Sequence, residues 1–170
     1  TVRANFFTNN IQSLFKYLLN TEQAHGASCA VGLSCIHPIL QMKTHQITSP
    51  ITAEQYIRPV FHDLDHEECW CIFLSCGNTV LCSQMLSKGT LTQTSIDSRT
   101  VLRQALLSNA KSIILLHNHL SGNPLPSASD INFTEKLRRA CQIMDVELID
   151  HIILAEDSFF SFSEERTINL

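Results

Sequence analysis

The segment IILLHNHLSGNPLPSASD, residues 113–130, decides how this chain folds, because it predicts a strand, a loop and a helix start in immediate succession. Its first four residues are apolar and are followed by His117 and His119, which indicates a buried strand with two histidines at its carboxyl end. Alternate side chains of an extended chain point the same way, so both imidazoles are expected on one side. Gly and Pro residues then turn the chain, and Ser127 to Asp130 is typical of a helix start.

Two histidines and an aspartate are the side-chain types of a catalytic zinc site, in which three protein ligands leave the fourth position to water. The leading prediction is therefore Zn²⁺ bound by His117, His119 and Asp130. The spacing alone is equally compatible with a metal-free arrangement, in which one histidine caps the strand and the other lies on the surface. Ser127-x-x-Asp130 also matches a capping box, in which the serine accepts the N3 amide hydrogen bond and the acid reaches back. Capping and metal binding can coexist, because the helix dipole favours a carboxylate there.

The length of 170 residues, with 44% hydrophobic residues, is enough to bury a core and is most simply one main domain. The net charge of −4 does not support DNA as a partner, although Lys136, Arg138 and Arg139 are clustered. Seven cysteines, mostly in apolar runs, and the lack of a visible signal peptide favour a reducing cytoplasm. No apolar stretch approaches transmembrane length, so no membrane partner is expected.

Outward from residues 113–130, apolar periodicity and turn signals predict alternating strands and helices. Helices are expected at residues 8–20, 52–60, 131–144 and, capped by Asp97 or Ser98, up to residue 106. Strands are expected at residues 69–73, 79–85, 113–116, 146–154 and 159–162. Residues 1–46 are expected to be an N-terminal helical segment and residues 47–170 the main domain. The alternation after Cys69 predicts an α/β sandwich with a mixed sheet.

The spacing His117-x-His119, seven residues, Ser127, two residues and Asp130 resembles the signature of the JAMM (JAB/MPN) metalloproteases. The longer text HNHLSGNPLPSASD is similar to the RadC branch of that superfamily, and the similarity extends from about residue 47 to residue 165. Similar flanks occur at residues 86–89, 96–99, 109–110, 149–153 and 160–162. The resemblance implies an α/β (α+β) fold of the JAB/MPN type, a cytidine-deaminase-like layered sandwich whose mixed β-sheet is flanked by helices. It also implies that residues 1–46 are a remnant of an upstream region.

The resemblance implies a reaction as well. The family uses an upstream glutamate on a strand as general acid/base, and counting back from Phe73 selects Glu67, with Glu68 the alternative after a one-residue slip. Zinc would lower the pKa of its bound water toward about 7, Glu67 would carry the proton to the leaving amine, and Ser127 would donate to the oxyanion. The bond attacked would be a peptide or isopeptide amide of a protein or peptide substrate. Without the resemblance, either glutamate is simply a solvated charge at a strand start.

A non-enzymatic alternative stays open. Leu120 stands where the family usually has a proline after the second histidine. The family is traditionally linked to DNA repair, and its superfamily includes members without activity. The chain could therefore be a non-catalytic JAB/MPN scaffold or interaction module in DNA metabolism. A zinc deaminase, whose fold is related, is disfavoured because its Pro-Cys-x-x-Cys is absent.

The remaining polar residues receive structural interpretations. The four cysteines within residues 69–82 include no Cys-x-x-Cys pair, and strand alternation explains them as core residues rather than a second metal site. The pair Asp150-His151 interrupts a predicted strand, where a structural hydrogen bond is expected rather than support for a metal ligand. The letters His-Asn-His match the HNH nuclease motif in name only, because the residues of that motif are spread across the sequence, so Asn118 is assigned no role.

Overall fold

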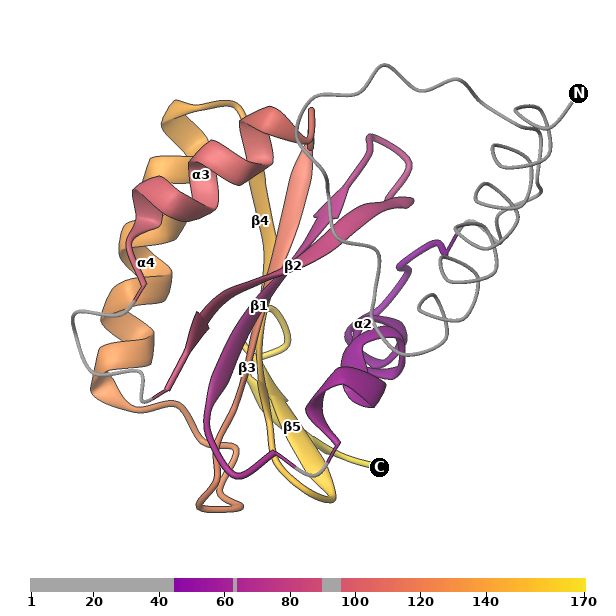
Figure 1. Ribbon diagram of the computed structural model, residues 1–170, viewed down its shortest axis with the longest axis vertical. Coiled ribbons are helices and arrows are strands. Elements are labelled where there is room, and N and C mark those ends of the chain that lie inside the picture. Colours follow the sequence, from indigo (N-terminus) through magenta and orange to yellow (C-terminus); the bar gives the residue numbers. More distant parts are fainter. Residues whose placement is uncertain (1–44, 63, 90–95) are drawn as a thin grey trace, which may run out of the picture.

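The computed structural model describes residues 45–62, 64–89 and 96–170, which form a mixed six-stranded sheet with helices on both faces (Figure 1). The strands are Glu68–Leu74 (β1), Val80–Lys88 (β2), Ser112–Asn118 (β3), Glu147–Leu154 (β4), Ser158–Ser161 (β5) and Arg166–Asn169 (β6). The helical elements are Pro50–Ile57 (α2), the 3₁₀ turn Arg58–Phe61 (η1), Ser98–Leu107 (α3) and Ala128–Ile143 (α4). The strand order is β2-β1-β3-β4-β5-β6; β3 and β4 are parallel, and the other neighbours are antiparallel. The predicted α/β (α+β) class is confirmed.

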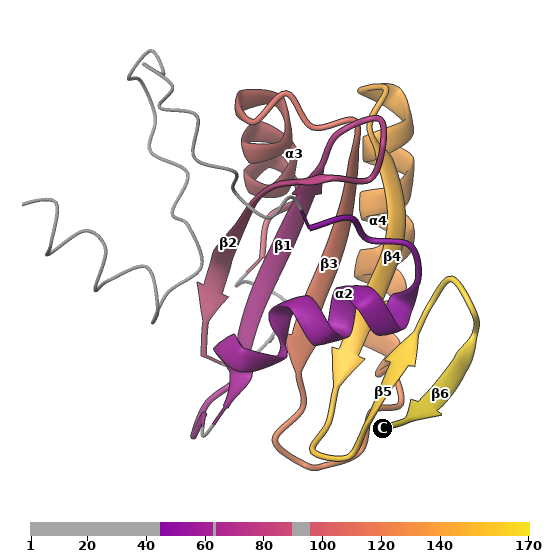
Figure 2. The ribbon, with the colours of Figure 1, turned by 90° about the vertical axis from the view of Figure 1, so that its right-hand side faces the viewer.

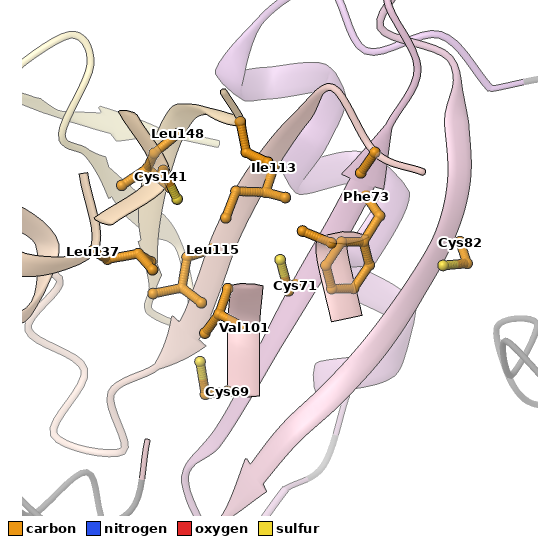
Figure 3. Close-up of a cluster of buried hydrophobic side chains, with 13 residues drawn as sticks. Cys69, Cys71, Phe73, Cys82, Val101, Ile113, Leu115, Leu137, Cys141 and Leu148 are labelled. Atoms are coloured by element: carbon orange, nitrogen blue, oxygen red, sulfur yellow. The ribbon is translucent and has the colours of Figure 1, made fainter. Parts of the chain in front are cut away.

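Different helices cover the two faces of the sheet, α3 and α4 on one and α2 on the other (Figures 1 and 2). Because side chains alternate along a strand, Cys71 and Phe73 of β1 pack toward α3 and α4, whereas Ile72 and Leu74 pack toward α2. Figure 3 shows the first cluster, in which apolar residues of the central strands meet the inner faces of α3 and α4. The central strand β3 is buried along its whole length, as a strand covered on both faces must be.

Polar side chains fix where α2, α3 and α4 begin. Ser49 caps α2, and Asp97 caps α3 by accepting a hydrogen bond from the backbone N–H of Arg99 at 3.0 Å. Ser127 caps α4 by accepting one from the N–H of Asp130 at 3.2 Å. Each bond satisfies an amide that the first helical turn leaves without an intrahelical partner. The caps predicted at Asp97 and Ser127 are therefore confirmed.

The β4 strand contains a β-bulge near its centre. Residues 113–114 of β3 lie opposite Leu148 and Asp150, so Ile149 is the additional residue on β4. The strand is otherwise continuous, and the interruption expected at Asp150-His151 is instead this irregularity one residue earlier. The bulge sets the facing of the residues after it: Asp150 points to the α2 side, whereas His151 points to α4.

The helix α2 and the strand β6 also differ from the sequence prediction. The helix expected at residues 52–60 begins earlier, at Pro50, because Ser49 caps it and proline suits the first helical position. It continues as η1, where Pro59 has no N–H to donate to an α-helical ladder. The edge strand β6 was not predicted, because its sequence RTIN lies largely exposed and lacks apolar alternation.

In the described part of the chain, no helix combines the length and the apolar character that a bilayer-crossing segment requires. The helical segment expected at residues 1–46 lies outside the described residues except for its last two. Gln46 is in the described part and forms an isolated antiparallel bridge with Thr79. The proposed boundary near residue 47 stays a prediction.

Candidate metal centre

The three predicted metal ligands converge at the carboxyl end of β3. His117 is fully buried in that strand, His119 follows its last residue, and Asp130 lies in the first turn of α4. His117 Nε2 lies 3.0 Å from His119 Nε2 and 3.5 Å from Asp130 Oδ1. His119 Nε2 lies 3.6 Å from Asp130 Oδ2. The expected placement of both imidazoles on one side is confirmed, and the loop brings the aspartate to them.

One atom from each of the three side chains can share a small cation, because these ligand atoms all lie within 4.8 Å of one another. The two distances to Asp130 involve different carboxylate oxygens, and the distance between the histidine nitrogens is the shortest of the three. Zinc binds imidazole nitrogen and carboxylate oxygen at about 2.0–2.2 Å, and tetrahedral angles then separate the ligand atoms by roughly 3.3–3.6 Å. Among the residues that the structure describes, His117, His119 and Asp130 are the His, Cys, Asp and Glu side chains that come together in this way. The residues present therefore fit a zinc ion held by three protein ligands.

The loop after β3 orients His119. Its Nδ1 lies 2.9 Å from the backbone oxygen of Asn123, and because a carbonyl can only accept, the ring donates its Nδ1–H. When the ring is neutral, its other nitrogen, Nε2, presents a lone pair to the site; when the ring is protonated, the Nε2–H faces Asp130 instead. Gly122 closes the turn with an N–H to the His119 carbonyl at 3.3 Å, and its φ of +72° is the left-handed conformation that glycine adopts without strain.

The three ligands differ in proton affinity. Burial lowers the pKa of His117 well below its ordinary value, so this ring is neutral. The hydrogen bond with Asp130 raises the pKa of His119. Burial raises the pKa of Asp130, but the hydrogen bonds from His119 and Ser127 outweigh this effect and hold the pKa below its usual range. A neutral imidazole, a second imidazole and an ionised carboxylate thus favour a cation between them.

The capping box and the metal site use the same carboxylate. Ser127 donates from its backbone N–H to Asp130 Oδ2 at 2.8 Å and from its hydroxyl to the same oxygen at 2.6 Å. The Asp130 N–H returns a hydrogen bond to Ser127 Oγ, which completes the box. Both interpretations of Ser127-x-x-Asp130 are therefore compatible, because helix capping holds the carboxylate where the histidines face it.

The alternative base, Glu68, is committed to other contacts. Its side chain is buried, and its carboxylate accepts the Trp70 indole N–H at 2.8 Å. The same carboxylate lies 2.7 Å from His66 Nε2. Trp70 packs in the cluster beneath α2, on the face away from the three ligands. Glu68 is therefore a structural residue of that face.

Glu67, the predicted base, lies directly before β1, two residues from Cys69. It has the same strand parity as Cys69, which lies directly opposite His117 in the β1–β3 ladder. The pKa of His119 is raised mainly by its hydrogen bond with the neighbouring aspartate, and the negative charge of Glu67 contributes to the same shift. The geometry therefore favours Glu67 over Glu68 as the group next to the metal site.

Asn118, which was assigned no role from the sequence, holds the backbone on both sides of Glu67. Its Oδ1 accepts the Glu68 N–H at 2.7 Å, and its Nδ2 donates to the His66 carbonyl at 3.0 Å. One signal in the sequence could have identified it. Asn118 is a polar residue between the two histidines, and strand alternation points its side chain to the opposite face of the sheet. Asn118 thus joins the end of β3 to the start of β1.

The pair Asp150-His151 divides its roles between the two faces. Asp150 accepts hydrogen bonds from the Ser161 hydroxyl at 2.6 Å and from the Ser163 N–H at 2.8 Å, which is the structural role expected of it. His151 is different, because its Nε2 lies 2.9 Å from Nδ1 of His117. The expected hydrogen bond at the strand irregularity is present for His151 as well, but its partner is a candidate metal ligand, so the supporting role that was disfavoured stays open for this residue.

The cysteines are core residues where the structure describes them as buried. Cys69, Cys71 and Cys82 lie in the cluster beneath α3 and α4, and burial raises the pKa of Cys69 and of Cys71. Cys76 is exposed. The core interpretation is therefore confirmed for Cys69, Cys71 and Cys82 and is wrong for Cys76, which lies in the turn between β1 and β2 rather than in a strand. Leu120, the departure inside the motif, is 53% exposed in the loop after His119.

A mixed sheet that joins a His-x-His strand end to the aspartate of a Ser-x-x-Asp helix start defines a JAB/MPN-type domain with a candidate metal site. A family model described as "RadC-like JAB domain" matches residues 47–167, which is most of the chain. The chain therefore belongs to the RadC-like JAB domain family. The extent of the match agrees with the resemblance that the sequence motifs indicate.

Curated relatives share this similarity. A UPF0758 protein of Cupriavidus taiwanensis is 44% identical over 116 residues, which cover 68% of this chain and 51% of the relative. A UPF0758 protein of Flavobacterium johnsoniae is 39% identical over 124 residues, or 73% of this chain and 54% of the relative. A UPF0758 protein of Enterococcus faecalis is 34% identical over 138 residues, which cover 81% of this chain and 60% of the relative. The chain thus spans about half the length of the curated relatives it matches.

Proposed function

We propose that this domain is a zinc-dependent metallopeptidase or isopeptidase that hydrolyses an amide bond in a protein or peptide. The observation that carries the proposal is the convergence of His117, His119 and Asp130, whose ligand atoms all lie within 4.8 Å of one another. Zinc bound there would supply Lewis acidity and lower the pKa of water toward neutrality. Because the chain spans about half the length of its relatives, the substrate of the whole protein is part of the proposal.

Glu67 carries the proton transfers in this proposal. It takes a proton from the attacking water and delivers it to the nitrogen of the leaving amine as the amide C–N bond breaks. The water oxygen joins the carbonyl carbon, so the products are a carboxylic acid and an amine and the atoms balance. What supports this role is that the negative charge of Glu67 contributes to the raised pKa of His119, after the larger effect of the hydrogen bond with Asp130.

Ser127 stabilises the developing oxyanion. Its hydroxyl donates its single proton to Asp130 Oδ2 at 2.6 Å, so the reaction requires that proton to turn toward the substrate carbonyl oxygen. The backbone N–H of Ser127 still holds the Asp130 carboxylate when the hydroxyl turns. Ser127 can therefore act on the substrate while the helix start stays capped.

A non-catalytic scaffold in DNA metabolism is the second candidate, and Leu120 is the observation that favours it. The residue replaces the usual family proline in the loop between His119 and Ser127, and its exposed side chain does not anchor that loop in the core. A less constrained loop would align the ligands less well with a substrate. This candidate predicts that Glu67→Gln leaves the cellular function intact. Both candidates include a cytoplasmic location, which would keep the cysteines reduced.

Zinc content tests the first half of the proposed function. Protein purified without added metal, then exposed to zinc and desalted, is expected to retain close to one ion per chain by elemental analysis. The matched variant Asp130→Asn is expected to retain little. A wild-type chain that holds only a small fraction of an ion after reconstitution would contradict the metal site.

Hydrolysis tests the second half. Zinc-loaded wild type and Glu67→Gln are incubated with a mixed peptide library, and new amino termini are quantified by mass spectrometry. The substitution is expected to slow cleavage by about 10²–10⁴-fold, because a general acid/base contributes that much, and to leave the zinc content unchanged. Equal cleavage by both proteins would remove Glu67 from the mechanism.

A further inference from the structure

His151 is a fully embedded imidazole for which the proposed reaction has no direct use. It is 2% exposed, and its ring stacks on Phe162 with a centroid distance of 4.8 Å. Its Nε2 lies 2.9 Å from His117 Nδ1, and its Nδ1 lies 2.6 Å from Thr134 Oγ1. The side chain therefore connects a metal ligand on β3 with the second turn of α4.

A backbone carbonyl determines which group donates in each of these hydrogen bonds. Thr134 Oγ1 lies 2.6 Å from the carbonyl oxygen of Asp130, one helical turn earlier. A carbonyl can only accept, so the single hydroxyl proton of Thr134 is committed to it. The hydroxyl oxygen must then accept from His151, and His151 donates through Nδ1–H.

The same logic fixes the next bond. The His151 ring is buried, and its two nitrogens contact His117 and Thr134 rather than a carboxylate, so the desolvation cost of a charge keeps the ring neutral. With its proton on Nδ1, its Nε2 can only accept. His117 therefore donates through Nδ1–H, and its own Nε2 carries a lone pair toward His119 and Asp130.

We infer that Thr134 and His151 are positioning residues: their hydrogen bonds hold His117 in the Nδ1–H tautomer, which leaves Nε2 free to bind a metal. The inference rests on the proposed metal site. The chain of hydrogen bonds from the Asp130 carbonyl through Thr134 and His151 to His117 is called the relay below. Asp130 contributes twice, because its carboxylate faces the histidines and its backbone carbonyl starts the relay. His119 reaches the same tautomer independently, through the Asn123 carbonyl. Without the relay, His117 can place its proton on Nε2 and block the ion.

Zinc affinity of two Thr134 variants tests the relay without a substrate. Thr134→Val keeps the shape but removes the hydroxyl that receives the His151 proton, whereas Thr134→Ser keeps the hydroxyl. Competition with a chromogenic chelator is expected to show zinc binding about 10–100-fold weaker for Thr134→Val, the usual cost of losing an outer hydrogen bond. Thr134→Ser is expected to stay within about threefold of wild type. Equal affinities for valine and serine variants, both folded by circular dichroism, overturn the inference.

The tautomer itself gives a second readout that a purely structural role would not change. Long-range ¹H–¹⁵N NMR spectra of the metal-free protein are expected to show His117 protonated on Nδ1 in wild type and Thr134→Ser. Thr134→Val is expected to shift the proton of His117 to Nε2. A wild-type His117 protonated on Nε2 overturns the inference, whatever the zinc affinity.

A second pair of variants covers the case in which Thr134→Val does not fold. His151→Phe keeps the stacking on Phe162 but offers His117 no acceptor, whereas the side-chain oxygen of His151→Gln can still accept. Weaker zinc binding by His151→Phe than by His151→Gln supports the relay, and the reverse order overturns it. A wild-type chain that binds no zinc refutes the proposed function, while the NMR tautomer still decides whether the relay exists.

Discussion

The two faces of the sheet bury acidic groups in opposite ways. On the α2 face, Asp150 is closed off by donors from Ser161 and Ser163, and Glu54 is paired with Arg58. Both carboxylates accept hydrogen bonds from donors within the protein. Such groups are satisfied structural acids, which is the usual condition of buried polar side chains.

On the α3/α4 face, Asp130 meets two imidazole nitrogens, and the hydrogen bonds at the opposite ring nitrogens leave lone pairs on these two whenever the rings are neutral. His117 Nε2 and His119 Nε2 are 3.0 Å apart, a distance that two lone pairs tolerate only with a cation or proton between them. Both kinds of carboxylate are buried, so burial does not distinguish them. The groups that a carboxylate faces do: hydrogen-bond donors indicate a structural acid, and imidazole nitrogens indicate a candidate metal ligand. The following substitutions test this difference.

The largest expected effect is the loss of zinc from Asp130→Asn, with Asp150→Asn as the matched change on the other face. An amide keeps the size of the carboxylate and can still accept capping bonds, but it removes the charge that holds the ion. Zinc affinity by chelator competition is expected to fall by more than about 100-fold, beyond the loss of an outer hydrogen bond. Asp150→Asn is expected to bind zinc like wild type. If both variants kept their affinity, the ligand assignment would be wrong.

A smaller effect, on folding, is expected from Asp150→Asn in the metal-free protein. The amide nitrogen cannot accept the bonds that Ser161 and Ser163 donate, so at least one buried donor loses its acceptor. The free energy of unfolding in urea is expected to fall by about 1–3 kcal/mol. A Ser161→Ala variant, which removes the donor as well, is the control and is expected to cost less in the Asp150→Asn background. Full stability of Asp150→Asn would show that this face does not depend on its carboxylate.

The smallest effect is a pH dependence centred on His119. Its folded-state pKa is raised above 6.5, chiefly by the hydrogen bond with Asp130. Its contribution to stability is therefore fully present below pH 6.5 and lost as pH rises through the folded-state pKa. The melting temperature of the metal-free protein is expected to decline over that window, and less so in His119→Asn. Zinc is expected to reverse the trend, because ligation needs the deprotonated ring. A wild type and variant with parallel pH profiles would contradict this assignment.

The sequence predicted the parts of the site that lie close together along the chain. His-x-His at a strand end and Ser-x-x-Asp at a helix start each follow from local geometry, and both appear in the structure as expected. Glu67 came from family resemblance, and its facing depends on the pairing of β1 with β3, which no local pattern specifies. Its catalytic role stays a prediction.

The residues that the sequence missed share a cause. Asn118, Thr134 and His151 are single polar residues whose partners come from other strands or helices. Their functions depend on register, and the bulge at Ile149 sets the register of β4. The edge strand β6 was not predicted for a related reason, because its pairing with β5, rather than its own sequence pattern, makes it a strand.

The parallel arrangement of β3 and β4 has a consequence for how this domain can change over evolution. One continuous crossover, from β3 through α4 to β4, contains the three ligands together with Thr134 and His151. The proposed base alone comes from outside it, at the start of β1. In the proposed function, ion binding and bond cleavage would therefore depend on different segments of the chain. Substitutions near β1 could abolish or alter the reaction while the ion stays bound. Few changes would then separate a peptidase from a scaffold stabilised by its metal.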